Sequence, residues 1–113
     1  MKEKSFRRGD VWLINLDPTI GHEQSGFRPA LIISDDLFNQ SLAELAIVLP
    51  ITSKNKGIKT HVEINYDFLP SVSYIKTEDI RSVSVQRLTK RIGCVENEVL
   101  QMVEYHLRNL LSL

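Results

Sequence analysis

The chain has 113 residues, with 14 Lys plus Arg and 14 Asp plus Glu, so its formal net charge is zero. Apolar residues make up 42% and charged residues 25%, which is typical of a folded globular protein and excludes a disordered chain. A purely electrostatic coat protein for DNA or RNA would be strongly basic, so that class is excluded as well. The single cysteine, Cys94, rules out an intrachain disulfide and a cysteine-based zinc site.

The length predicts one domain, residues 1–113. The charged start at 1–8 is not followed by an apolar core of a signal peptide. No apolar run approaches the roughly 20 residues that a membrane helix needs. We therefore expect a cytoplasmic protein that makes no membrane contact.

Short strands are expected through the first four-fifths of the chain, because apolar or alternating segments are separated by Gly, Pro and Asp. A short helix or turn at 37–42 follows the helix-start signal Asp35-Asp36. Trp12 lies in an apolar strand and is expected in the core. The predicted strands are 11–16, 30–34, 45–51, 61–66, 72–77 and 88–95.

The period changes at the C-terminus, where apolar residues recur at helical spacing between about 96 and 111. Many short antiparallel strands followed by one amphipathic helix predict a mainly β fold, a small barrel with a C-terminal α-helix. The apolar face of this helix could cover the end of the barrel or contribute to a dimer interface, and the sequence does not choose between the two.

The densest polar cluster is the loop at 19–29. It holds an imidazole, a carboxylate, an amide and a guanidinium, from His22, Glu23, Gln24 and Arg28. Such a group in one long loop could carry chemistry. It could equally be a solvated loop with a structural ion pair.

A second group lies where the strand at 45–51 ends, at Thr52 and Ser53. The basic loop, Ser53–Thr60, follows and carries Lys54, Lys56 and Lys59. The hydroxyls could bind substrate or only start a turn, and the lysines could hold a nucleic acid backbone or only be solvated.

A third group, at 76–81, places Lys76, Glu78 and Asp79 close together in the sequence. Paired carboxylates beside cations suit proton transfer, but they also suit a charged turn. His61 and His106 are weak signals, and the three histidines are too scattered to predict a metal site. No phosphate-binding glycine motif is present, and no cofactor is expected.

An ordered set of motifs resembles the MazF/PemK (Kid) family, the toxins of bacterial toxin–antitoxin pairs. The resemblance extends over nearly the whole chain, from about residue 8 to residue 113. The matching segments are RGDVW at 8–12, LDP at 16–18, GHEQSGFRPALII at 21–33, PITS at 50–53, THVEI at 60–64 and EDIRSV at 78–83.

The resemblance implies a small SH3-like barrel of the CcdB/MazF type with a C-terminal helix, usually in a homodimer. It implies a metal-independent endoribonuclease that cuts single-stranded RNA, chiefly mRNA, at short sequences. It also implies a cognate antitoxin, often acidic and partly disordered, that covers the active face.

The resemblance also implies roles for individual residues. Arg28 and Thr52 stand at the family's catalytic Arg and Thr positions, and His22 matches the imidazole of the PemK branch. Glu78 falls where that branch has its catalytic Asp, and Lys76 where it has an Arg. The family usually has Gln at the position of Asp79, and the choice of His22 or Glu78 as general base stays open.

The chemistry of RNA cleavage fits these residue types. The 2′-OH attacks the neighbouring phosphorus, a base takes its proton and an acid protonates the leaving 5′-oxygen, so DNA is not cut. The forked, permanently charged guanidinium of Arg28 suits the charge that develops on the phosphate. Thr52 is expected to donate a hydrogen bond to that phosphate, while Glu23 and Gln24 are expected to hold the loop and Arg28.

Two other functions remain open. A CcdB-type gyrase poison has a similar barrel but acts by binding through its C-terminal helix, and the GHEQSGFRP loop together with Thr52 favours the ribonuclease instead. A catalytically inactive interaction module is the other alternative, and the joint presence of His22, Arg28 and Thr52 argues against it.

Overall fold

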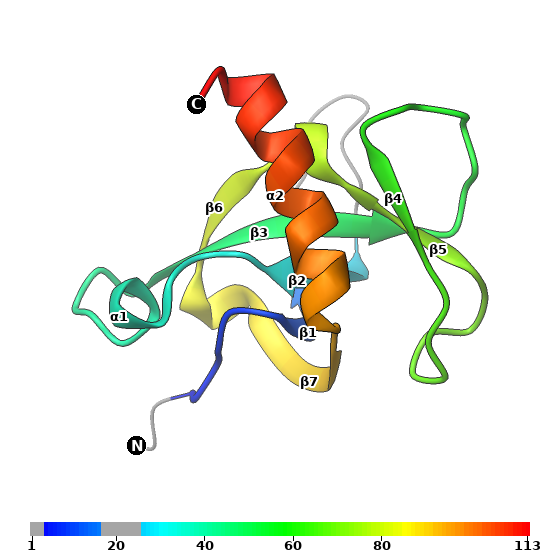
Figure 1. The fold of residues 1–113 in the computed structure, drawn as a ribbon. Coiled ribbons are helices and arrows are strands. Elements are labelled where there is room, and N and C mark those ends of the chain that lie inside the picture. The colour runs from blue at the N-terminus through cyan, green and yellow to red at the C-terminus, as the bar shows by residue number, and fades with distance from the viewer. Residues whose placement is uncertain (1–3, 17–25) are drawn as a thin grey trace.

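The computed structural model describes residues 4–16 and 26–113. These residues contain a sheet of seven antiparallel strands and a C-terminal helix (Figure 1). The strands are β1 (Asp10–Asn15), β2 (Phe27–Ile32), β3 (Leu45–Thr52), β4 (His61–Ile64), β5 (Ser73–Lys76), β6 (Arg81–Ser84) and β7 (Leu88–Cys94). The helices are α1 (Asp36–Asn39) and α2 (Asn97–Leu111), with short 3-10 turns η1 (Thr77–Asp79) and η2 (Val85–Arg87).

The longest strand, β3, organises the sheet. Hydrogen-bonded neighbours follow the order β4-β5-β3-β2-β1-β7, and β6 pairs with the first half of β3. In the described residues no pairing returns from β7 to β4, so the sheet stays open rather than closing into a complete barrel. The expected mainly β fold with a C-terminal helix is confirmed.

Alternation along the strands divides the apolar residues between two cores, one on each face of the sheet. The first core contains Val11, Leu31, Leu49, Ile51, Val62 and Ile75, and the fully buried Val103 of α2 packs into it. The second core contains Trp12, Ile14, Ala30, Ile32, Val48 and Val83. The prediction that Trp12 belongs to the core is confirmed.

The C-terminal helix covers the first core. Val99, Leu100 and Leu107 pack around its buried Val103, as the helical spacing of these residues predicted. Met102 and Tyr105 stay exposed on its outer face. Of the two roles that the sequence left open for this helix, the covering role is the one that the described residues show.

The largest differences from the prediction are the start of β2 and a missed strand, while the ends of the other predicted elements shift by no more than three residues. Strand β2 begins at Phe27, three positions before the expected start at residue 30, because Arg28 and Pro29 pair with Ile14 and Leu13 of β1. Strand β6 was missed altogether. Only Val83 of its four residues is apolar and buried, so it gives no alternating signal and reads as part of a charged turn.

Candidate active site

The ends of β2 and β3 bring the two main candidates together. The pairing of β2 with β3 runs from Ile32 and Val48 to Ala30 and Pro50, and Arg28 and Thr52 each lie two residues beyond the last pair, on the same face as Ala30 and Pro50. Directly opposed residues share one face of a sheet, with Cβ atoms about 4.5–5.5 Å apart. The sheet therefore directs the exposed Arg28 and the half-buried Thr52 to the same surface.

This surface continues across the neighbouring strands as a polar row. Thr52 lies opposite Tyr74 of β5, and Tyr74 lies opposite Glu63 of β4. The alternate residues of these strands, such as Ile75 and Val62, point to the other face and into the first core. The polar face, defined by Arg28, Thr52, Tyr74 and Glu63, is thus opposite to the face that α2 covers. The half-buried Tyr74 was not among the predicted site residues.

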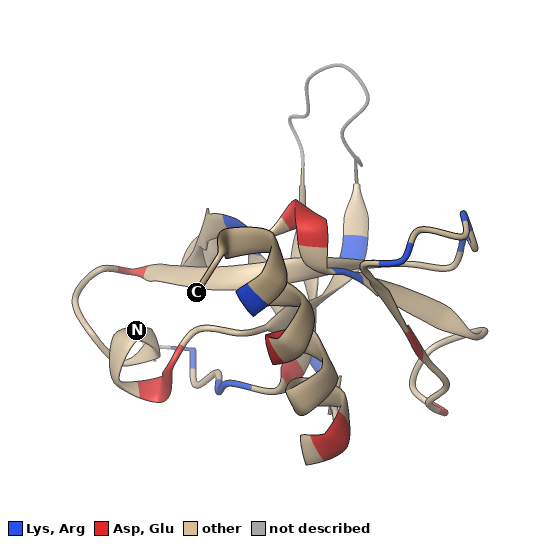
Figure 2. Ribbon diagram, turned by 45° about the horizontal axis from the view of Figure 1, so that its top comes forward, with Lys and Arg blue, Asp and Glu red and all other residues tan. Residues whose placement is uncertain are grey.

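The hydroxyl of Thr52 has one oriented partner. Its Oγ1 accepts a hydrogen bond from the backbone N–H of Lys54 at 3.2 Å, so the hydroxyl hydrogen points elsewhere and is available to donate. Ser53 and the three lysines of the basic loop are exposed. Figure 2 shows positive residues along this loop, directly beyond the end of β3. The basic loop therefore begins directly after Thr52, one member of the polar row.

The Glu78 carboxylate is held by two donors. Its Oε1 accepts from the Thr60 hydroxyl at 2.8 Å, and its Oε2 lies 2.8 Å from Nε2 of His61. Burial alone would raise the pKa of Glu78, but its own backbone N–H, Thr60 and His61 together hold the pKa below its usual value. Glu78 is therefore a fixed and ionised carboxylate near neutral pH.

His61 lies on the same face as the polar row. It stands opposite Lys76, two residues from Tyr74 along β5, and side chains at that spacing share a face. Its side chain is only 3% exposed, and its Nδ1 is buried without a hydrogen-bond partner among the described residues. In the sequence His61 is only a weak signal, although the alternation at 61–66 already separated it from the apolar residues.

The other two charged residues of the third group form an ion-pair cluster. Arg81 donates two hydrogen bonds to Asp79, at 2.9 and 3.0 Å, and Nζ of Lys76 lies 3.5 Å from the same carboxylate. Both bonds come from Nη2, so one guanidinium nitrogen contacts both oxygens and holds the carboxylate in place. Of the two neighbouring carboxylates, Asp79 therefore stabilises the turn, whereas Glu78 faces the histidine.

Several predicted residues fall outside this description. His22, Glu23 and Gln24 lie outside the described residues. Among the described residues, no group of three or more His, Cys, Asp or Glu side chains is arranged to hold a metal ion. The described helices include none that combines the length and the apolarity needed to cross a membrane.

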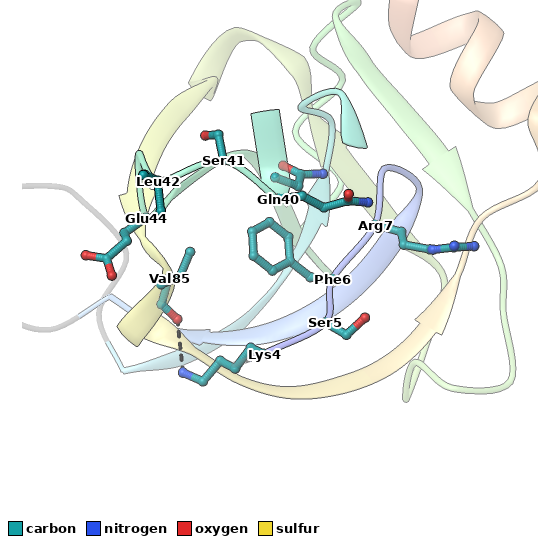
Figure 3. Close-up of a pocket in the computed structure, with 10 residues that line it drawn as sticks. Lys4, Ser5, Phe6, Arg7, Gln40, Ser41, Leu42, Glu44 and Val85 are labelled. Atoms are coloured by element: carbon teal, nitrogen blue, oxygen red, sulfur yellow. Dashed lines mark hydrogen bonds between the residues drawn. The ribbon is translucent and has the colours of Figure 1, made fainter. Parts of the chain in front are cut away.

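A cavity of about 430 Å³ lies near the opposite end of β3, and it contains none of the predicted site residues. Figure 3 shows Phe6 at its centre and Glu44 at the rim. Lys4 donates a hydrogen bond to the backbone oxygen of Val85 there. The strand between Leu45 and Thr52 spans about 23 Å at 3.3 Å per residue, so this cavity is remote from the polar face.

Comparison with known proteins decides the family. Residues 7–111 match the model of the PemK-like, MazF-like toxins of type II toxin–antitoxin systems. The chain belongs to this toxin family. The match spans both cores, the polar face and α2, so it describes the whole fold rather than one motif.

Individual relatives agree with this toxin family. The chain is 39% identical over 112 residues to endoribonuclease EndoA of Bacillus subtilis, covering 95% of each chain. It is similar to the crystal structure of MazF from Deinococcus radiodurans, with a TM-score of 0.86, 28% identity and coverage of 98% and 100% of the two chains. A MazE–MazF structure from the same organism matches with a TM-score of 0.83, 28% identity and coverage of 98% and 99%.

Proposed function

We propose that this toxin is a sequence-specific endoribonuclease that cleaves single-stranded RNA, chiefly mRNA, without a metal ion. The observation that carries the proposal is the polar face, where β2 and β3 present the Arg28 guanidinium and the Thr52 hydroxyl on one side of the sheet, together with the Glu78 carboxylate, which Thr60 and His61 hold at the end of the basic loop. The likeness to EndoA, a named endoribonuclease, supports the same reaction class.

In the proposed reaction the 2′-oxygen attacks the adjacent phosphorus, and the bond between phosphorus and the 5′-oxygen breaks. The products are a 2′,3′-cyclic phosphate and a 5′-OH end. Arg28 stabilises the negative charge that develops on the phosphate oxygens, and Thr52 donates a hydrogen bond to the same group. A preorganised donor of this kind contributes about 3–4 kcal/mol to transition-state stabilisation.

The proton transfers are assigned to two side chains. Glu78 takes the proton of the 2′-OH, since its lowered pKa keeps it ionised near neutral pH. His22 gives a proton to the leaving 5′-oxygen, a role that suits an imidazole because this group exchanges protons near neutral pH. Each transfer contributes roughly 100- to 10,000-fold to the rate.

The remaining predicted residues bind or position. The exposed Ser53 and the lysines of the basic loop contact the RNA backbone, and Tyr74 offers a ring on which a base can stack. Lys76 adds positive charge while paired with Asp79. Glu23 and Gln24 hold the loop that precedes Arg28.

The proposal includes two protein partners. A cognate antitoxin binds over the active face, as the MazE–MazF complexes of D. radiodurans suggest by their pairing of a toxin with a second protein. A second copy of the chain forms a homodimer. Both partners and the target are cytoplasmic.

The test uses purified wild type, Arg28→Ala and the matched control Arg108→Ala, whose arginine is exposed on α2. Each protein is mixed with a long single-stranded RNA in EDTA, and the product ends are mapped. We expect discrete cuts with cyclic phosphate and 5′-OH ends from wild type and the control, and at least a roughly 100-fold slower reaction from Arg28→Ala. Intact RNA with folded wild type would contradict the proposal.

A further inference from the structure

We propose that His61 is a positioning residue that holds the Glu78 carboxylate in place for the cleavage reaction. The inference rests on the proposed function, in which Glu78 acts as the base. In the sequence, His61 is far from the loop at 19–29, and 17 positions separate it from Glu78. The β4–β5 hairpin and η1 bring the two side chains together.

The geometry leaves little freedom to the carboxylate. Nε2 of His61 holds Oε2 at 2.8 Å, and the Thr60 hydroxyl holds Oε1 at 2.8 Å. A carboxylate offers about four lone-pair directions; the Thr60 hydroxyl and His61 take two of them, and the backbone N–H of Glu78 also stabilises the ionised form. The side chain of Glu78 is 33% exposed, so the carboxylate remains accessible from the surface.

The imidazole itself is enclosed. With 3% of its side chain exposed, His61 does not reach substrate and acts only through Glu78. Its backbone N–H donates to the carbonyl of Ile58 at 3.0 Å, which fixes the start of β4. In the neutral ring, the bond to Glu78 places the hydrogen on Nε2 and leaves the buried Nδ1 as an unused acceptor.

The same contacts join Glu78 to the basic loop. The fully buried Thr77 donates from its hydroxyl to the backbone oxygen of Thr60 at 2.6 Å, so η1 and the end of the loop are bonded twice. The carboxylate is thereby held against the end of the basic loop. A substitution at His61 is expected to disturb the carboxylate directly and the loop indirectly.

Other charged groups lie on the elements packed around η1. They are Glu63 on β4, Lys76, Asp79 and Arg81 near η1, and Glu104, His106 and Arg108 on α2. Asp79 already pairs with Lys76 and Arg81. The direct donors that stabilise the ionised Glu78 are its own backbone N–H, Thr60 and His61.

The test compares His61→Leu, which removes the donor, with His61→Gln, whose amide can donate in place of Nε2. His106→Gln is the matched control on α2. Single-turnover cleavage of a defined RNA is measured from about pH 4 to 8, together with the pKa of Glu78 by carbon NMR. We expect His61→Leu to raise the pKa of Glu78, to shift the acid limb of the rate profile to higher pH and to slow cleavage about tenfold.

We expect His61→Gln to restore most of the rate and the acid limb, and His106→Gln to match wild type. An unchanged Glu78 pKa in folded His61→Leu would overturn the positioning role, even if cleavage were lost. Glu78→Gln separates the two proposals. If that variant keeps the wild-type acid limb, Glu78 is not the base and the assignment in the proposed function fails, whatever His61 does.

Discussion

Replacing Gly93 in β7 by alanine tests the packing of the first core. A Cβ at this position would lie 2.4, 2.5 and 2.6 Å from three ring atoms of Phe68. Ordinary contact begins near 3.4 Å, so the ring must retreat by about 1 Å. The ring is stacked on Tyr66 at 5.0 Å, and the Tyr66 hydroxyl accepts from the backbone N–H of Glu96, so the shift reaches the start of α2.

The expected cost follows from two opposing effects. Overpacking a core destabilises the fold by about 1–3 kcal/mol. Replacing glycine by alanine also restricts the unfolded chain, which stabilises the fold by about 0.4–1 kcal/mol. We therefore expect Gly93→Ala to lower the free energy of unfolding by about 1–2 kcal/mol in urea titrations. In a Phe68→Ala background the clash is absent, and the same substitution is expected to be neutral or stabilising.

Gly57→Ala serves as the comparison. Gly57 has φ +66°, and no atom lies within 4 Å of the place that a Cβ would take. Alanine there is expected to cost about 1–2 kcal/mol through backbone strain alone, in both backgrounds. An equal cost of Gly93→Ala with and without the Phe68 ring would refute the packing argument. So would a neutral Gly93→Ala in the wild-type background.

Three further predictions concern the core, the basic loop and pH. Val103→Ala should lower the free energy of unfolding by about 2–3 kcal/mol in urea, and exposed Met102→Ala by less than about 0.5 kcal/mol; similar losses would contradict the burial. Changing the three lysines of the basic loop to Gln should reduce the salt slope of RNA binding by about 2, measured in the slowly cleaving Arg28→Ala background; an unchanged slope would exclude backbone contacts there. The lowered pKa of Glu78 stabilises the fold above its unfolded value of 4.5, and this contribution disappears as pH falls through the folded pKa. The difference in free energy of unfolding between wild type and Glu78→Gln should therefore shrink from about pH 7 to about pH 3. A difference that does not change with pH would contradict a stabilising role of ionised Glu78.

Much of the fold was predictable because its strongest signals are local. The apolar run at 45–51 predicted β3 to within one residue, and the helical spacing of Val99, Val103 and Leu107 predicted α2. Both elements have a single continuous pattern and clear ends. Strand β6 has no such pattern, since it is held by its pairing with β3 and not by its own apolar residues.

The part of the candidate site that the sequence predicted consists of motif residues at the ends of strands. Arg28 and Thr52 were singled out from the sequence, and the register between β2 and β3 explains why they share a surface. The contact between His61 and Glu78 depends on pairing between β4 and β5 and on the turn at η1. No local pattern encodes such a long-range contact, so the histidine was only a weak signal.

The pairing of β1 with β7 links the beginning of the chain to its end. Asp10 lies opposite Cys94, and the two apolar cores are completed by residues of β7 and α2, such as Leu88 and Val103. During synthesis, β1 and β2 can pair early, but their buried faces stay uncovered until the last quarter of the chain has emerged. A ribosome that stalls before this point releases no folded toxin, so assembly of the active surface is tied to completed translation.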